Sequence, residues 1–171
     1  SAGAIAGTFT GKPQGTIFAA SGSYFAISYT GGDGNDVTLT TQTLTPIQQW
    51  RLANFGTVQN TGTAADLFDA NNDGELNLVD FATGQNPNAA TLTQPSLVNN
   101  GSTLEFTYIK NKAATDVTYT VEWSDTLTIG SWSNAGVTEQ ILSDNGTVQT
   151  VKANVQAPLG GRRFLRLKFS K

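Results

Sequence analysis

A run of oxygen-bearing side chains at alternating positions is the strongest chemical signal in this sequence. Residues 69–80 read DANNDGELNLVD, which matches the metal-loop pattern D-x-[DN]-x-[DN]-G. Asp69, Asn71 and Asp73 alternate along the chain, so a curled backbone directs their side-chain oxygens at one point. Gly74 permits the sharp turn that follows. Hard oxygen donors in this number favour Ca²⁺ over Zn²⁺ or Mg²⁺.

The second half of the loop supplies the remaining ligands of the predicted ion. We expect the backbone carbonyl of Glu75, and a side-chain oxygen or a water contact from Asn77. Asp80 closes the coordination sphere from the first turn of a following helix. It is shorter than the glutamate usual at this position, which predicts a tighter helix entry. The predicted calcium ligands are Asp69, Asn71, Asp73, Glu75, Asn77 and Asp80.

We expect the ion to act mainly on folding. An affinity of about 10⁻⁴ to 10⁻³ M or tighter, in the extracellular range, suits such a role better than that of a cytosolic sensor. A weaker signal is GGDGNDVTL at residues 31–39, which formally matches a single copy of the calcium-binding nonapeptide G-G-x-G-x-D-x-U-x. Thr38 stands where that repeat has a large apolar residue. We therefore favour a hairpin or coil-end turn without metal over a second ion site here.

The composition removes most catalytic chemistry. The chain has no His and no Cys, which excludes imidazole bases, thiolate nucleophiles and nearly all ordinary zinc sites. The remaining carboxylates show no telling spacing, so we expect a protein that is not an enzyme. The net charge of -3 argues against a dedicated nucleic-acid binder, and no apolar stretch is long enough to predict a membrane span.

Two helices should position the predicted calcium loop. The first begins after Thr45, a plausible N-cap followed by Pro46, and ends at Gly56. The second runs from about Asn77 to Gly84, with a proline shortly after its end. Residues 88–94 are polar and read as a linker. Residues 45–94 therefore form a helix, calcium loop and helix followed by a linker.

Alternating apolar residues predict strands on both sides of this segment. The N-terminal strands are expected at 16–20, 23–30 and 36–43. From Pro95 onward about six short strands predict an antiparallel β-sandwich. The chain is thus expected to be mainly β, with a β-strand segment at 1–44, the calcium segment at 45–94 and the sandwich at 95–171.

Two further features have both a structural and a functional interpretation. Aromatic side chains could form glycan-binding platforms, but core packing is the favoured interpretation for Trp123 and its neighbours. The candidate platform residues are Trp50, Tyr108, Trp123 and Trp132. The C-terminal end, from Lys152 onward, carries basic residues and no acidic ones. Because these bases alternate with apolar residues, we interpret them as the solvated face of a final strand.

Three stretches carry resemblances to known families. Residues 13–40, PQGTIFAASGSYFAISYTGGDGNDVTLT, resemble the end of the passenger region of bacterial autotransporter-associated β-strand repeat proteins, which implies a parallel β-helix upstream. Residues 50–87 resemble a single dockerin-type calcium repeat, whose ligands correspond to Asp69, Asn71, Asp73, Asn77 and Asp80. A dockerin has two such loops, and this sequence has one. The part from LEFTYIK to RRFLRLKFSK is similar to C-terminal β domains of large secreted bacterial surface proteins.

These resemblances imply a calcium-binding structural protein of the extracellular space or bacterial cell surface. We expect the C-terminal segment of a larger secreted chain, because the sequence lacks even an initiator Met. The N-terminal strands have unpaired edges, which leaves two alternatives. The chain forms a homo-oligomer or a filament by β-strand addition, or it is a monomer that caps the upstream part of its parent chain. The alternative function is a binding module, either an adhesin for carbohydrate or a dockerin-like module for a protein partner.

Overall fold

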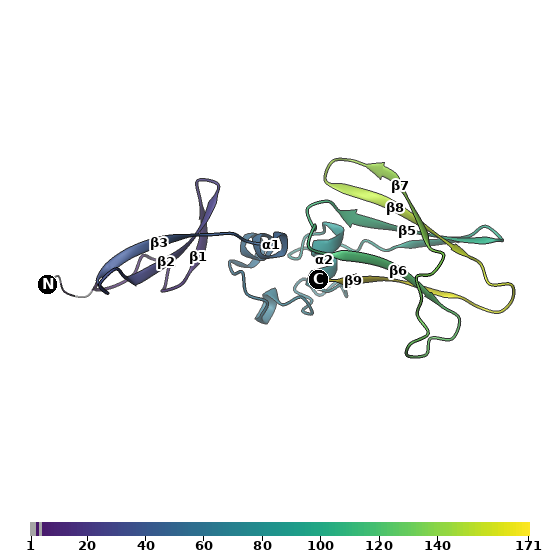
Figure 1. Ribbon diagram of the computed structural model, residues 1–171, viewed down its shortest axis with the longest axis horizontal. Coiled ribbons are helices and arrows are strands. Elements are labelled where there is room, and N and C mark those ends of the chain that lie inside the picture. Colours follow the sequence, from purple (N-terminus) through teal and green to yellow (C-terminus); the bar gives the residue numbers. More distant parts are fainter. Residues whose placement is uncertain (1–2, 4) are drawn as a thin grey trace. The chain divides into compact units, whose positions relative to one another are not determined.

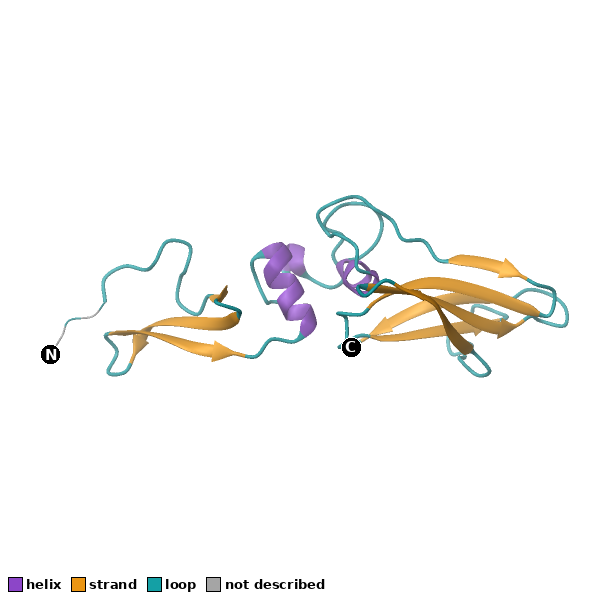
Figure 2. Cartoon of the chain, turned by 90° about the horizontal axis from the view of Figure 1, so that it is seen from above, coloured by secondary structure: helices purple, strands orange, loops and turns teal. Residues whose placement is uncertain are grey.

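A computed structural model of the chain describes residue 3 and residues 5–171 (Figure 1). The fold is mainly β, with antiparallel sheets and two short α-helices (Figure 2). The backbone groups into two compact units, one ending at Asn60 and one beginning at Thr61. Among the described residues, no helix has both the length and the apolar character needed to cross a membrane.

The first unit contains an antiparallel meander of three strands in the order β1-β2-β3. Ile27 is buried on one face of this sheet, where it lies opposite Leu39 of the third strand. The pairing is antiparallel throughout, so these strands form a sheet of their own. The parallel β-helix expected upstream is not part of this sequence and stays a prediction. The strands are β1 (Ile17–Ala20), β2 (Ser23–Gly31) and β3 (Asp36–Gln42).

Helix α1 (Pro46–Phe55) follows the sheet and has the ends that the sequence predicts. Thr45 is its N-cap: the threonine side chain accepts from the backbone N–H of Gln48, and the Gln48 side chain accepts from the backbone N–H of Thr45. This capping box satisfies two N–H groups that would otherwise lack a helical partner. Gly56 ends the helix with φ of 71°, a left-handed conformation that glycine adopts without strain.

The second unit is built on two antiparallel sheets that face each other as a β-sandwich. Four strands in the order β4-β5-β8-β7 form the larger sheet, and β6 pairs with β9 in the smaller one. The expectation of about six strands in this region is confirmed. They are β4 (Ser96–Asn99), β5 (Thr103–Asn111), β6 (Thr118–Ser124), β7 (Thr138–Asp144), β8 (Val148–Gln156) and β9 (Phe164–Ser170).

The core of the sandwich comes from alternate residues of its central strands. Strand β5 contributes Leu104, Phe106 and Tyr108, which lie on one face because successive side chains in a strand point to opposite sides. Strand β8 contributes alternate residues in the same way, and Val121 of β6 packs against both from the smaller sheet. Tyr119, Trp123, Leu165 and Leu167 are half-buried against this cluster, which confirms the prediction of aromatic core packing for Trp123.

Helix α2 (Asn77–Thr83) also belongs to the second unit, and hydrogen bonds fix its C-terminal end to the sandwich. The side chain of Asn111 donates to the carbonyl of Phe81 at 2.7 Å, and the hydroxyl of Tyr119 donates to the carbonyl of Ala82 at 2.6 Å. Both carbonyls belong to the last turn of the helix, where intrahelical partners are missing. The sandwich therefore supplies the partners that α2 cannot supply for itself.

The two units divide the chain differently from the sequence analysis, which placed boundaries after residues 44 and 94. Helix α1 groups with the N-terminal sheet, whereas the predicted calcium loop groups with the sandwich. A short 3₁₀ turn, η1 (Gly62–Ala64), opens the second unit. The division into three segments stays a prediction about sequence origin.

Candidate metal centre

The backbone of residues 69–77 curls through hydrogen bonds from its own N–H groups to the acidic side chains. Asp69 Oδ2 accepts from the N–H of Gly74 at 2.9 Å, and Asp73 Oδ1 accepts from the N–H of Glu75 at 2.8 Å. Gly74 has φ of 94°, which an L side chain would adopt only with strain. Asn72 also has positive φ, a conformation that Asn tolerates better than most residues. The loop thus turns its carboxylates toward its interior.

Two hydrogen bonds fix the orientation of the Asn77 side chain and so the direction of its oxygen. Its side-chain nitrogen donates to the carbonyls of Thr63 at 2.9 Å and Ala65 at 2.8 Å. Since a carbonyl accepts but cannot donate, the NH₂ group must occupy this side, and Oδ1 must point the other way. That oxygen has no hydrogen-bond partner, and water cannot provide one from the surface because the residue is only 1% exposed.

Asp80 presents two more buried oxygens without partners. The residue has no exposed surface, and neither Oδ1 nor Oδ2 receives a hydrogen bond. It lies three residues after Asn77 in α2, a spacing that puts both side chains on the same face of a helix. Buried polar groups in folded proteins nearly always have a partner. Asn77 and Asp80 thus bring three buried oxygens without hydrogen-bond partners to one helix face, a donor set that a cation could satisfy.

The electrostatics of the loop lead to the same conclusion. Burial raises the pKa of Asp80 to about 7, and the negative charges of Asp73, Glu75 and Asp69 contribute to this increase. The acidic residues of the loop therefore act on Asp80 as unfavourable like charges. A divalent cation at the three orphaned oxygens would reverse this situation, because it attracts the charges that otherwise repel each other.

Like Asp69 and Asp73, two further predicted ligands have side-chain oxygens that accept hydrogen bonds. The Glu75 carboxylate accepts from the side-chain amide of Gln85, which leaves its backbone carbonyl for the role expected of it. Asn71 Oδ1 accepts from the N–H of Asp73 at 3.2 Å, while its nitrogen donates to the carboxylate of Asp73 at 2.8 Å. Asn77 and Asp80 thus have free oxygens, and Asn71 would have to exchange an internal hydrogen bond for an ion contact.

Carboxylates alone do not make the site. Among the described residues, no group of three or more His, Cys, Asp or Glu side chains is arranged to hold a metal ion. The ligand set must therefore include the amide oxygen of Asn77 and backbone carbonyls beside the carboxylates. Such a mixed set of oxygens is typical of calcium and poor for zinc.

The segment at residues 88–94 contacts the loop, which the sequence did not predict. Residues 88–94 were expected to be a linker, yet the side chain of Asn71 donates to the carbonyl of Ala89 at 2.9 Å. The N–H of Thr91 donates to Asp73 Oδ2 at 3.2 Å. Thr63 and Ala65, which orient Asn77, were also not predicted. These contacts use backbone atoms, which any sequence provides, so no residue pattern could have indicated them.

The other candidate sites take structural roles. Residues 31–39 form the β2–β3 turn and the first part of β3, with the N–H of Gly34 donating to the carbonyl of Gly31 at 2.8 Å. Tyr108 is buried in the core of the sandwich. The guanidinium of Arg163 lies 3.8 Å from the ring centre of Trp123, and that of Arg166 lies 4.0 Å from the ring centre of Trp132. The chain's own side chains thus cover a face of each of these tryptophans.

No known protein family, curated protein or solved structure matches this chain. The functional assignment must therefore come from the geometry of the loop and from the packing around it.

Proposed function

We propose that this chain is a non-catalytic, calcium-binding structural protein of the extracellular space or cell surface. In this role Ca²⁺ binds the loop at residues 69–80 and holds helix α2 in its place on the β-sandwich. Asp80, Asn77 through its side-chain oxygen and Glu75 through its backbone carbonyl would bind the ion first. The carboxylates of Asp69 and Asp73, which accept from backbone N–H groups in the ion-free loop, would then move together onto it. Asn71 completes the set when its side chain turns from Asp73 toward the ion.

One observation carries this proposal: Asn77 Oδ1 and both carboxylate oxygens of Asp80 are buried without any hydrogen-bond partner. An unpartnered buried charge is strongly unfavourable, because it loses hydration and gains nothing in return. The loop sequence alone would also suit an ordinary turn. A cation bound at this helix face would give all three oxygens a partner, which supports calcium binding over an ordinary turn.

The ion would act on the whole second unit and not on the loop alone. Asp80 belongs to α2, whose last turn receives hydrogen bonds from Asn111 of β5 and Tyr119 of β6. Directly after β9, at the end of the smaller sheet that contacts α2, Lys171 forms an ion pair with Asp66, just before the loop. Calcium that fixes α2 thereby fixes both sheets of the sandwich to the loop.

An extracellular location fits this use of calcium. Loops of this kind in extracellular modules bind Ca²⁺ at about 10⁻⁴ to 10⁻³ M, where the ion acts as a permanent structural part. If free Ca²⁺ exceeds the dissociation constant about 100-fold, binding adds about 2.7 kcal/mol to the free energy of unfolding. The chain has no disulfides to provide such stabilisation otherwise.

Thermal unfolding with excess Ca²⁺ and with excess chelator tests this proposal. We expect a higher melting temperature in Ca²⁺, with little effect of Mg²⁺ at equal concentration, because the small Mg²⁺ ion demands a stricter octahedral geometry. A suitable control variant is Asp144→Asn, which removes an exposed carboxylate far from the loop in sequence. Its melting temperature should rise in Ca²⁺ as that of the wild type does. Equal melting temperatures in Ca²⁺ and chelator would contradict the proposal.

A further inference from the structure

The smaller sheet of the sandwich covers only part of the larger one. Leu97 of β4 lies directly opposite Phe106 of β5 and so shares its inward-facing side. Phe106 is 7% exposed, whereas Leu97 is 52% exposed. The difference arises because two strands cannot cover a sheet of four. The inner face of β4 therefore presents an exposed leucine, followed by Asn99, on which the described strands place no cover.

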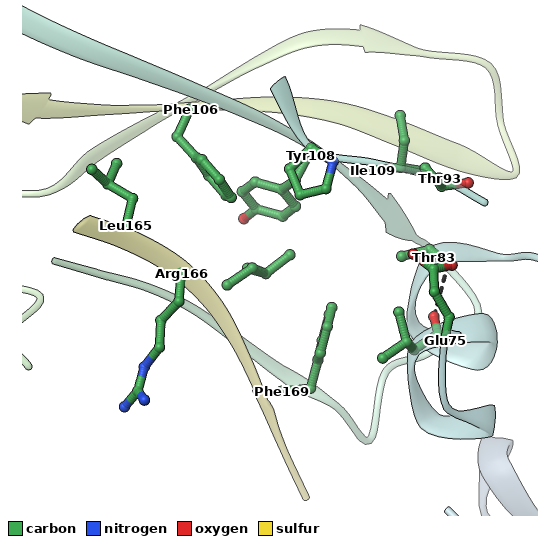
Figure 3. A pocket seen from close by; sticks show the side chains of 12 residues that line it. Glu75, Thr83, Thr93, Phe106, Tyr108, Ile109, Leu165, Arg166 and Phe169 are labelled. Carbon is green, nitrogen blue, oxygen red and sulfur yellow. Dashed lines mark hydrogen bonds between the residues drawn. The ribbon is translucent and has the colours of Figure 1, made fainter. Parts of the chain in front are cut away.

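Next to this uncovered face lies a groove of about 250 Å³ (Figure 3). Phe106 and Ile109 of β5 line one side, and Leu165, Leu167 and Phe169 of β9 line the other. Val79 of α2 contributes to the end near the calcium loop. The groove is mainly apolar, and in Figure 3 the charged end of Arg166 points away from it. An apolar groove beside a strand suits another strand with apolar side chains.

Strand β9 also has a free edge at this groove. Within the part of the chain that the structure describes, β9 pairs with β6 alone. Its second edge therefore presents N–H and C=O groups without a partner strand. Such an edge is a template for pairing with another chain. A strand added there would widen the smaller sheet and cover Leu97.

We propose that strand β3 of a second copy of this chain binds at this edge, next to β9. Strand β3 pairs only with β2 among the described strands, so it too has a free edge. Val37 and Leu39 lie on the face of Ile27 and are 41% and 53% exposed. Each of the two strands has seven residues, so they match in length. Pairing would place Val37 and Leu39 over the groove and the uncovered face of β4.

The charges of the two strands are complementary. Strand β3 and the turn before it carry Asp33 and Asp36 and no basic residue. Strand β9 carries Arg166 and Lys168 and no acidic residue. Both cations pair with the single carboxylate of Glu122 on β6, so one positive charge stays in excess, and Lys168 is half exposed. Arg162 adds another positive charge just before β9. Opposite charges at the rim favour this pairing over contact between two β3 edges, which would bring like charges together.

The proposed contact joins two different surfaces, so a pair of copies keeps one free surface of each kind: strand β3 on one copy and the β9 edge on the other. A contact of this type propagates unless the rotation between copies happens to close a ring. The inference deepens the proposed structural role and rests on it in one respect, because α2 forms part of the groove. We therefore expect assembly to need Ca²⁺.

Light scattering after size-exclusion chromatography measures the assembly directly. We expect the mass to rise above the 18.0 kDa of one chain with increasing concentration in Ca²⁺, and to fall toward it in chelator. Leu97→Lys should abolish the increase, because it places a charge on the uncovered inner face of β4, beside the groove. The neighbouring Val98→Lys is the matched control: Val98 is 51% exposed but points to the opposite face. Equal behaviour of these two variants would overturn the proposal.

The partner strand is tested from its own side. Leu39→Lys changes an exposed residue, so the first unit should keep its fold while assembly is lost. Cysteine variants then locate the contact, since the native chain has no Cys. Thr40→Cys chains mixed with Arg166→Cys or Lys168→Cys chains should form a mixed disulfide. A mixture with Gln140→Cys, which lies on the free edge strand β7, should not. Cross-linking equal to that control would contradict the assignment of β9.

Failure of this inference is distinguishable from failure of the proposed function. If the melting temperature rises with Ca²⁺ but the mass stays at 18.0 kDa at every concentration, the calcium role stands and the assembly is wrong. If Ca²⁺ changes neither melting nor mass, but the wild-type chain assembles and Leu97→Lys does not, the edge contact stands and the calcium role is wrong. A concentration-independent mass with intramolecular Thr40–Lys168 cross-links in a double variant would assign the groove to the chain's own β3.

Discussion

At the scale of single residues, Asp80 is the acidic residue of the loop whose charged form is most unfavourable. Its carboxylate has no exposed surface and no hydrogen-bond donor, and burial together with nearby acidic groups raises its pKa to about 7. If the loop binds Ca²⁺ as proposed, a group in this position destabilises the ion-free protein and stabilises the ion-bound one. Its substitution should therefore have opposite effects in the two states.

We predict that Asp80→Asn leaves the chelator-treated protein at least as stable as the wild type, because it removes a buried charge that repels its neighbours. In Ca²⁺ the variant should lose the stabilisation that the wild type gains. Differential scanning calorimetry in both buffers measures the two effects. An Asp80→Asn variant that still gains stability from Ca²⁺ like the wild type would show that the ion binds elsewhere.

Asn77 should behave differently, because it has a structural role that does not involve the ion. Its side chain satisfies the carbonyls of Thr63 and Ala65, so Asn77→Ala leaves two buried acceptors without a donor. Each unsatisfied group costs about 1–3 kcal/mol. We predict a loss of stability in chelator as well as in Ca²⁺, measured by urea unfolding. A variant as stable as the wild type in chelator would mean that water replaces the amide.

At the scale of elements, helix α2 connects the loop to the sandwich. Its last turn has no intrahelical partners for its carbonyls, and Tyr119 and Asn111 provide them. A short helix is unstable alone and depends on tertiary contacts. The position of Asp80, and hence the geometry of the site, should therefore depend on residues of the sandwich that never touch the ion.

This dependence is measurable with Tyr119→Phe, which removes the hydroxyl that donates to the Ala82 carbonyl at 2.6 Å. We expect a loss of about 1 kcal/mol in the free energy of unfolding. We also expect weaker Ca²⁺ binding, detected as a higher Ca²⁺ concentration at half-maximal stabilisation. Tyr24→Phe, in the first unit, provides a matched control. If Tyr119→Phe lowers stability but leaves the Ca²⁺ dependence unchanged, the packing of α2 on the sandwich does not affect Ca²⁺ binding at the loop.

The helices illustrate what the sequence could predict. Thr45, Pro46 and Gly56 fix the ends of α1 through local backbone chemistry, so its boundaries were predicted correctly. Gly84 did the same for the C-terminal end of α2, whereas its N-terminal end has no side-chain cap. The grouping of elements was not predictable in this way. Whether a helix packs on the strands before it or after it depends on distant contacts, and these leave no local pattern.

The candidate site was predictable to a similar extent. Spacing placed six oxygen-bearing residues in one loop, but it did not show that Asn77 and Asp80 alone would keep buried oxygens without partners. It also did not show that Glu75 would turn its carboxylate toward Gln85. These details depend on the carbonyls of Thr63 and Ala65 and on the chain near Ala89, which reach the loop only in the folded state.

At the scale of the whole molecule, the loop and the sandwich belong to one compact unit and the N-terminal sheet to another. We predict that chelation increases amide hydrogen exchange in β5, β6, β8 and β9 while leaving β1, β2 and β3 of monomeric Leu39→Lys chains unchanged. Hydrogen exchange followed by mass spectrometry resolves the two regions. Equal increases in both would show that calcium stabilises the chain as one cooperative structure.

The most direct test of the calcium site is a titration of ¹⁵N-labelled monomeric Leu39→Lys protein with Ca²⁺, followed by NMR. We predict one saturable site, with the largest shifts at the amides of residues 69–80, including Gly74, whose N–H donates to Asp69. Adding Asp80→Asn should remove the saturable response. Small linear shifts scattered over surface carboxylates, unchanged by Asp80→Asn, would contradict the central claim that the buried oxygens of Asn77 and Asp80 bind calcium.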